Sequence, residues 1–257
     1  MNMLDLTKYI RNWKNAEKNF SHGNMTEYLI FTKSDSLTLD TPGAILQYIK
    51  RFSRLVLDPK TSSLEVVHPE EQEIFYVVNG EAKIVTNKKK EKLKKGCALF
   101  IPANVSHRFV NKSTAPLELL AITEDVSPDK KVKKDILIRK YQELPVAKMP
   151  DGSLYHWTHY PRTLFSREDG LHKIHYVSIV DILDPNKWAE PHAHIQGTDE
   201  VWYALNGSSN MRLGNEIIFQ EPGKAIMIPP DSETVHSSKP IKTSSFFFFL
   251  YTPTLEK

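Results

Sequence analysis

Four landmarks recur along this chain at one constant separation, and this internal repeat constrains the fold more than any other feature. Each landmark in the first half has a counterpart 127 residues later. The four pairs are Glu73 and Glu200, Gly80 and Gly207, Gly96 and Gly223, and Pro102 and Pro229. Landmarks repeated at a fixed offset indicate duplicated units. The chain is therefore expected to form two related domains of about 125 residues each.

Both halves consist of short β-branched and aromatic runs separated by Pro, Gly, Asn and Asp, which is typical of strands in a sandwich or barrel. The runs are Arg54–Leu57, Glu73–Val78, Ala82–Thr86, Ala98–Ile101 and Leu117–Ile122 in the first half, and Ile174–Ile182, Glu200–Leu205, Ile217–Phe219, Ala225–Ile228 and Phe246–Tyr251 in the second. The four consecutive aromatic residues of the last run predict a strand packed on both faces. The sequence predicts an all-β protein.

The N-terminal segment has a different periodicity. Apolar residues at helical spacing predict one amphipathic helix, whose stripe is Leu6, Tyr9, Ile10, Trp13 and Phe20. This stripe either docks on the same chain or forms a dimer contact, and the residues leave both open. The predicted organisation is a helix and lead-in over 1–40, a first barrel over 41–130, a linker over 131–152 and a second barrel over 153–257.

Composition and charge exclude several classes of protein. The chain is 40% hydrophobic and 25% charged, an average globular composition rather than a disordered one. The single cysteine, Cys97, cannot form an intramolecular disulfide, and the first 20 residues lack the apolar run of a signal peptide, so a cytoplasmic location is expected. The longest apolar run, Phe246–Tyr251, is far too short to span a membrane.

The net charge of +3 comes from one run of lysines. These lysines have no aromatic residues among them and lie between two expected strands, so they predict a solvated hairpin rather than a nucleic-acid surface: Lys88, Lys89, Lys90, Lys92, Lys94 and Lys95. The chain has only 10 glycines and no Gly-rich phosphate-binding loop, so no nucleotide cofactor is expected.

The second half contains residue types that bind metals. His192 and His194 are separated by one residue, so on a strand their imidazoles leave the same face. Glu200 follows, and His236 comes after the repeated Gly–Pro segment. Three neutral imidazoles and one carboxylate suit a divalent transition metal such as Fe, Mn, Ni, Co or Zn. A lone His-x-His is more often structural, but the place of Glu200 and His236 in the repeat favours a metal site.

These residues resemble the two motifs of the cupin family, and the chain from about residue 43 to residue 251 resembles a two-domain cupin, or bicupin. The family usually has three or four residues between His-x-His and Glu, a spacing that Asp199 would satisfy. Glu200 keeps the family's six-residue step to Gly207 and is favoured. The resemblance implies two tandem jelly-roll (double-stranded β-helix) barrels. It also implies one divalent metal in the second barrel, held by His192, His194, Glu200 and His236.

The first half resembles the second motif almost throughout but has an incomplete first motif. His68 is present, whereas Val66 stands where another histidine is expected. Either His68, Glu73 and His107 form a second metal site of two histidines and one carboxylate, or this barrel holds no metal. The metal-free interpretation is the plainer of the two.

Three functions are compatible with such a centre, whose charge near +1 and open coordination positions suit a small anionic ligand. An oxygenase acting on a small organic acid or phenol is favoured slightly. The alternatives are a redox-neutral isomerase, hydrolase or decarboxylase, with sugar-like substrates included, and a non-catalytic binding protein. Strand alternation makes Trp202 and Ser238 secondary candidates for substrate contact. The expected partners are a small molecule and a second copy of the chain in a homodimer, with no nucleic acid and no membrane.

Overall fold

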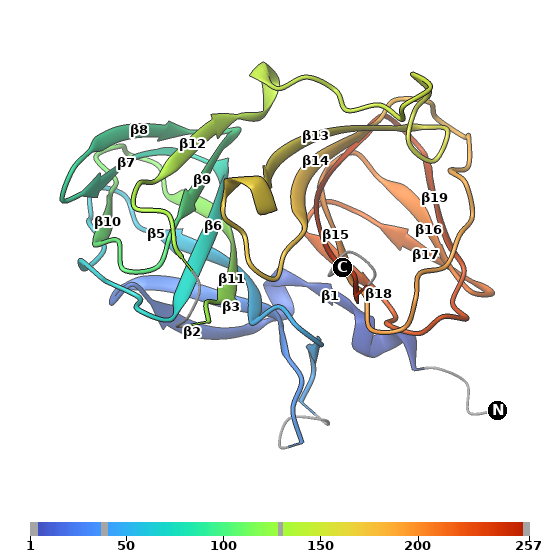
Figure 1. Ribbon diagram of the computed structural model, residues 1–257, viewed down its shortest axis with the longest axis horizontal. Helices are drawn as coiled ribbons and strands as arrows, with labels where there is room; N and C mark the ends of the chain where they lie inside the picture. The colour runs from blue at the N-terminus through green and yellow to red at the C-terminus, as the bar shows by residue number, and fades with distance from the viewer. Residues whose placement is uncertain (1–4, 37–40, 128–130, 254–257) are drawn as a thin grey trace.

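The structure is a computed structural model that describes residues 5–36, 41–127 and 131–253. Parts of the predicted lead-in (1–4 and 37–40), of the first barrel (128–130) and of the second barrel (254–257) lie outside the described residues. Figure 1 shows two β-barrels side by side, an N-terminal one and a C-terminal one. Among the described residues the helices are all short 3-10 turns: η1 (Leu6–Tyr9), η2 (Trp13–Asn15), η3 (Tyr141–Glu143) and η4 (Arg167–Asp169). No helix among them is long and apolar enough to cross a membrane.

The N-terminal barrel is built from a large and a small antiparallel sheet. The large sheet has the order β12 (Leu137–Lys140), β9 (Cys97–Ile101), β6 (Glu71–Asn79), β11 (Leu117–Asp125), β5 (Arg51–Leu57), β3 (Met25–Lys33) and β2 (Glu17–Ser21), with β4 (Ala44–Leu46) parallel to β3. The small sheet has the order β10 (His107–Val110), β7 (Glu81–Thr86) and β8 (Lys90–Lys94). The lysine run lies on the β7–β8 hairpin, as predicted.

The C-terminal barrel repeats this plan. Its large sheet has the order β1 (Ile10–Asn12), β18 (Lys224–Ile228), β15 (Asp199–Asn206), β20 (Ser244–Tyr251), β14 (Tyr176–Ile182) and β13 (His159–Ser166). Its small sheet has the order β17 (Glu216–Gln220), β16 (Ser209–Leu213) and β19 (His236–Pro240). Strands β9, β6, β11 and β5 of one barrel therefore correspond in order to β18, β15, β20 and β14 of the other. The sequence repeat is a structural duplication, and the all-β prediction is confirmed.

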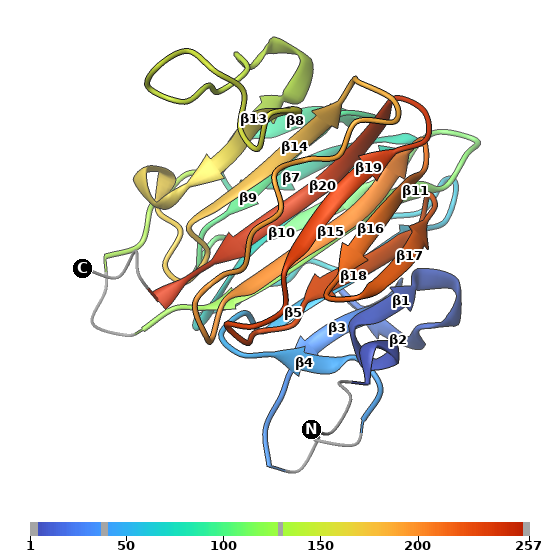
Figure 2. The same ribbon diagram turned by 90° about the vertical axis from the view of Figure 1, so that its right-hand side faces the viewer.

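Strand alternation divides the apolar residues among three cores. On β6, Phe75 and Val77 point into the N-terminal barrel, whereas Ile74 and Tyr76 join a core between the two large sheets. The four aromatic residues of β20 divide in the same way. Phe247 and Phe249 pack between the sheets, and Phe246 and Phe248 fill the C-terminal barrel. Both faces of this strand are buried, which accounts for its unbroken aromatic run. Figure 2 shows β20 between β14 and β15 in the large sheet.

The prediction of an N-terminal amphipathic helix is wrong. The segment instead forms η1, β1, η2 and β2. Backbone pairing outweighs the helical spacing, because Ile10–Asn12 extends the free edge of β18 and the N–H of Trp13 donates to the carbonyl of Gly223 at 3.2 Å. The Asn12 side chain also accepts a hydrogen bond from the N–H of Lys14, which favours a turn over a helix. Phe20, expected in the apolar stripe, is 66% exposed.

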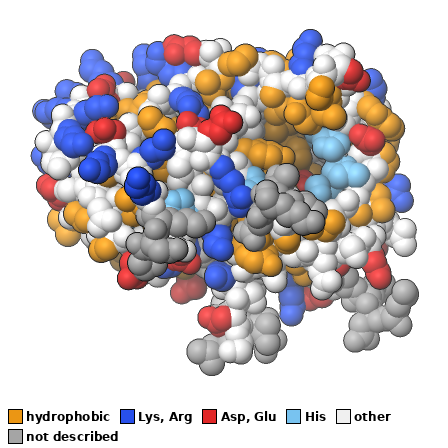
Figure 3. Space-filling model, in the orientation of Figure 1, with side chains coloured by type: hydrophobic (Ala, Val, Ile, Leu, Met, Phe, Trp, Pro, Cys, Tyr) orange, Lys and Arg blue, Asp and Glu red, His pale blue; other side chains and the backbone are white. Residues whose placement is uncertain are grey.

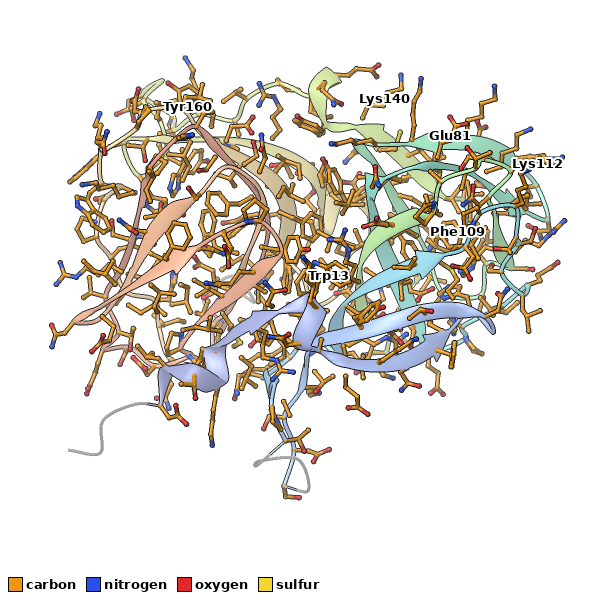
Figure 4. The ribbon with its side chains drawn as sticks, turned by 180° about the vertical axis from the view of Figure 1, so that it is seen from behind. Trp13, Glu81, Phe109, Lys112, Lys140 and Tyr160 are labelled. Atoms are coloured by element: carbon orange, nitrogen blue, oxygen red, sulfur yellow. The ribbon has the colours of Figure 1, made fainter. Side chains whose placement is uncertain are left out.

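The N-terminal segment is thus an intramolecular clasp across both barrels. Figure 4 shows Trp13 at their junction. Its ring lies under the guanidinium of Arg54, 4.2 Å from the ring centre, and meets Tyr28 edge-on. Strand β12, which lies within the predicted 131–152 linker, pairs with β9 of the N-terminal barrel. It occupies the edge that corresponds to the one on which β1 pairs with β18. The homodimer stays a prediction.

Two buried carboxylates tie the barrels together reciprocally. Asp199 of the C-terminal barrel accepts the backbone N–H groups of residues 47–49, at 2.8–3.1 Å, in the segment that leads into β5. Glu124 of the N-terminal barrel accepts those of residues 172–174, at 2.7–2.9 Å, in the corresponding segment before β14. Each carboxylate therefore fixes the other barrel's lead-in.

Candidate metal centre

Four residues of the C-terminal barrel converge inside it. His192 lies in the loop before β15 and His236 begins β19. Their backbones form a two-hydrogen-bond bridge with N···O distances of 3.1 and 2.8 Å. One ring nitrogen from each of His192, His194 and His236 lies within 4.8 Å of the others. Glu200 on β15 contacts Nε2 of His194, and its Oε1 lies 3.3 Å from Nε2 of His236. The structure brings all four predicted ligands together.

The alternative carboxylate, Asp199, lies elsewhere. Successive residues of a strand face opposite sides of the sheet. Glu200 faces the barrel interior with Trp202, whereas Asp199 faces the junction between the barrels and binds the backbone of residues 47–49. Asp199 therefore does not join the histidines.

The donor set of this cluster suits a divalent metal. His192 Nδ1 lies 3.1 Å from the carbonyl of Glu190, so it donates its proton there and leaves a lone pair on Nε2. Both ring nitrogens of the buried His236 lack a hydrogen-bond partner. Ligands about 2.1 Å from an ion stand about 3.0 to 3.4 Å apart at octahedral or tetrahedral angles. The 3.3 Å between His236 and Glu200 matches that spacing.

Burial and mutual proximity set the protonation of the cluster. Burial lowers the pKa of His192 to about 4, and the neighbouring His236 adds to the effect. Burial opposes ionisation of Glu200, yet His236 and His194 beside it hold the pKa of that carboxyl well below its usual value. Burial also disfavours protonation of His194, but the Glu200 carboxylate outweighs it and raises the His194 pKa. The carboxylate is therefore ionised and His192 neutral near pH 7, as metal binding requires.

The two secondary candidates lie next to this cluster. The Trp202 indole N–H donates to Glu200 Oε1 at 2.5 Å, so Trp202 orients a candidate ligand. The Ser238 hydroxyl lies 3.2 Å from Nε2 of His159, whose ring is 5.3 Å from that of Trp202. His156 stacks on His192 with ring centres 4.2 Å apart. His156 and His159 lie outside the residues that resemble the cupin motifs. Their position near the histidine motif became visible only in the fold.

The cluster borders a cavity of about 290 Å³. Figure 3 shows histidine side chains at the rim of a hollow lined by hydrophobic side chains in the C-terminal half. The lining is Ala147, Tyr155, His156, His159, Pro161, Thr163, Ser166, Tyr176, Ser178, Val180, His192, His194, Glu200, Trp202, Phe248 and Leu250. This lining contains no lysine or arginine, so a metal ion would be the main cation that a substrate meets there.

The N-terminal barrel contains a second cluster. Glu73 on β6 lies with its Oε2 3.5 Å from Nε2 of His68 and 3.4 Å from Nε2 of His107, the first residue of β10. The structure therefore brings the three candidate residues of this half together. It adds His22, from the turn between β2 and β3, whose Nε2 lies 3.5 Å from the same oxygen. Sequence reasoning missed His22, because it lies 46 residues before His68 and outside both motifs.

Comparisons with known proteins bear on the fold of both halves. Residues 53–123 match the family model described as "Cupin domain". This match lies within the N-terminal barrel, in the half where the sequence motifs resemble those of the cupin family. No curated protein matches the chain.

Several solved structures share the fold over nearly the whole chain. The protein Ylba from Escherichia coli has 14% identity, covers 94% of this chain and 89% of its own, and has a TM-score of 0.69. The bacterial pirin YhhW from Escherichia coli, in complex with nickel(II), has 14% identity, covers 95% and 99%, and has a TM-score of 0.68. The oxalate decarboxylase of Lactobacillus farciminis, in a formate complex, has 12% identity, covers 95% and 86%, and has a TM-score of 0.67.

Proposed function

We propose that this protein is a bicupin whose C-terminal barrel is a metal-dependent enzyme of the oxygenase type. Its substrate would be a small, mostly apolar molecule that carries one phenol or carboxylate group. The observation that supports this most is the position of His192, His194, Glu200 and His236 beside a cavity with aromatic and aliphatic walls.

The charges of the site favour a singly charged substrate. A divalent ion with the ionised Glu200 and neutral imidazoles leaves a charge near +1, which one phenolate or carboxylate balances. A doubly charged acid would need a second cation, and the cavity lining has none. The apolar walls, among them Val180, Phe248 and Leu250, favour an aromatic or aliphatic body.

The protein residues have separate tasks in this proposal. Imidazole and carboxylate ligands would hold the ion, which supplies Lewis acidity and, if it is redox-active, a place for O2 next to the substrate. Trp202 keeps Glu200 in position through its indole N–H. The aromatic and aliphatic walls exclude water, which strengthens the electrostatic stabilisation of a bound anion.

One observation favours the redox-neutral alternative at the same metal. His156 and His159 lie in the cavity as two further imidazoles, and groups of this kind transfer protons in isomerases, hydrolases and decarboxylases. Their ring centres are 5.3 Å apart. An acid–base pair of this kind was not evident from the sequence.

Oxygen consumption separates the candidate functions. Wild-type protein, reconstituted with the metal it binds, would be incubated with a panel of phenols and small carboxylic acids while O2 and each substrate are measured. The proposal expects substrate-dependent O2 uptake that is lost in the His192→Ala/His236→Ala variant. Substrate conversion without O2 uptake would overturn it in favour of the redox-neutral enzyme. Binding without conversion of any compound would overturn it in favour of a non-catalytic binding protein.

A further inference from the structure

We propose that the N-terminal barrel holds a divalent transition metal of its own, and that His22 supplies the imidazole that the sequence lacks at Val66. The ligands of this second site are His22, His68, Glu73 and His107. One of the four thus comes from a hairpin outside the cupin motifs. The site is independent of the activity proposed for the C-terminal barrel.

Backbone pairing identifies the position that His22 replaces. In the C-terminal barrel, His192 forms an isolated antiparallel bridge with His236. In the N-terminal barrel, Val66 forms the same bridge with His107, and both of its N···O distances are 3.0 Å. Val66 is thus the structural counterpart of His192. A valine there removes one ligand and leaves room on that side of the cluster.

His22 occupies that side. Its Nε2 lies 3.1 Å from Nε2 of His107 and 3.5 Å from Oε2 of Glu73. Four donors about 2.1 Å from one ion would stand about 3.0 to 3.4 Å apart. The distances from Glu73 Oε2 to the three imidazoles, and from His22 to His107, run from 3.1 to 3.5 Å. The four donor atoms all lie within 4.8 Å of one another. The four donors are therefore close enough together to share one ion.

The hairpin is built to hold His22 there. The His22 backbone has a φ of 49°, a left-handed conformation that is uncommon for a residue with a side chain. Its carbonyl accepts the N–H of Leu64 at 2.9 Å, and the Asn24 side chain donates to the carbonyl of Ser62 at 3.0 Å. The turn between β2 and β3 is thus attached to the segment that leads to Val66 (Figure 1).

Two polar atoms of the cluster lack a hydrogen-bond partner. Glu73 is only 2% exposed, and its Oε2 has no hydrogen-bond partner. Nε2 of His68 also lacks one. His107 donates its Nδ1 proton to the carbonyl of Val105 at 2.9 Å, which leaves a lone pair on Nε2. A cation between the buried carboxylate oxygen and the imidazole nitrogens would satisfy these atoms.

The surroundings indicate a structural site rather than a catalytic one. The His22 ring packs edge-on against Phe75 and Phe109, with ring centres 5.8 and 5.9 Å away. Figure 4 shows Phe109 within this barrel. His22, Glu73 and His107 are each at most 4% exposed, whereas the His68 side chain is 29% exposed, so protein encloses three of the four ligands. A bound ion would therefore fasten the β2–β3 hairpin to the barrel, because metal binding and folding of the ligand segment are coupled.

Metal content per chain tests this site without any assay of activity. The measurement uses full-length His192→Ala/His236→Ala protein, purified without a metal-binding tag and analysed by plasma mass spectrometry. The proposal expects about one equivalent of metal in this background and almost none after the further change His22→Ala. His172→Ala, which removes an imidazole outside both clusters, is the matched control and should keep the equivalent.

A rescue variant distinguishes ligand loss from misfolding. Adding Val66→His to the His22→Ala protein should restore about one equivalent, because the imidazole returns at the position that matches His192. Cobalt(II) substitution gives a second readout, since its visible spectrum should change with His22→Ala and recover with Val66→His. One equivalent that survives His22→Ala would overturn the role of His22. No metal in the double-variant background, even after reconstitution, would overturn the second site itself.

Discussion

At the scale of single residues, the environment of Glu200 determines what the C-terminal centre can do. The carboxylate contacts two imidazoles and one indole N–H, and it is almost fully buried. Each contact stabilises the ionised form of the Glu200 carboxyl and helps to fix the orientation of its side chain. Positions of this kind can be predicted from strand alternation, which places Glu200 and Trp202 on one face. The indole hydrogen bond itself depends on a rotamer and could not be predicted.

Trp202→Phe tests this positioning role. The variant keeps the aromatic ring but loses the N–H that binds Glu200, so metal affinity of the C-terminal site should fall about tenfold or more. Competition with a chromogenic chelator would measure it. Trp188→Phe is the matched control, because Trp188 packs under Lys239 and is not in the cavity lining around Glu200. Equal affinities in the wild type and the Trp202→Phe protein would contradict the role.

His159 predicts a pH dependence of stability. Burial lowers the pKa of His159 to about 3, with His156 adding to the effect, whereas the unfolded chain binds the proton near 6.5. As pH falls below 6.5, the unfolded state takes up the proton first, and the free energy of unfolding falls by about 1.4 kcal/mol per pH unit from this residue.

Denaturant unfolding at several pH values between 6.5 and 4 would measure this loss, with a chelator present so that protons do not compete with metal. His159→Gln cannot titrate in this range, so its stability should depend less steeply on pH than that of the wild type. Parallel curves for the two proteins would show that His159 does not carry the effect.

At the scale of elements, the N-terminal segment shows where periodicity misleads. Its apolar spacing is helical, but the free edge of β18 offers backbone partners that a helix would leave unused. A free strand edge exists only once the barrel has folded. The spacing of apolar residues in the N-terminal segment therefore cannot indicate that such an edge will be there. For the same reason β12 was predicted to be part of a linker, because its pairing partner is the edge of β9. Strands in the middle of each sheet were predicted because their runs are long and β-branched or aromatic.

Trp13→Ala tests the clasp formed by this segment. Trp13 stacks on the Arg54 guanidinium and packs against Tyr28, so truncation should lower the free energy of unfolding by about 2 kcal/mol. Phe20→Ala is the control from the same segment. Phe20 is 66% exposed, and its loss should change stability by less than about 0.5 kcal/mol. Similar effects for the two variants, measured by urea unfolding, would contradict the clasp.

His22 also belongs to this scale, because a hairpin brings it to the cluster. The sequence around it, Ser21-His22-Gly23-Asn24, has the composition of a turn, and this was its only local signal. Which barrel wall the turn would meet depends on the pairing of β3 with β5. Local sequence patterns do not contain that information, so His68, Glu73 and His107 could be proposed from motifs and His22 could not.

At the scale of the whole molecule, the duplication explains both the fold and the junction. The repeat of Glu, Gly and Pro predicted two barrels, because these residues mark the same turns and strand in each half. The reciprocal contacts of Asp199 and Glu124 follow the same symmetry, yet neither was predicted. Their partners are backbone N–H groups more than 45 residues away in sequence, and backbone groups have no sequence pattern.

Removing one of these carboxylates tests how strongly the barrels depend on each other. Glu124→Ala leaves the N–H groups of residues 172–174 without an acceptor in a buried place, so the free energy of unfolding should fall by about 3 kcal/mol or more. Asp135→Ala is the control, because Asp135 forms an exposed pair with Lys88 that contributes less than about 1 kcal/mol. A change of under about 1 kcal/mol for Glu124→Ala would show that the barrels do not rely on this contact.

We propose above that His192, His194, Glu200 and His236 form a metal centre. The most direct test is the metal content per chain of the wild type and of His192→Ala/His236→Ala, measured side by side after purification without chelators. We expect the variant to lose about one equivalent, and the equivalent that remains in it to depend on His22. A wild type that stays free of metal after reconstitution, or a variant that loses none, would contradict it.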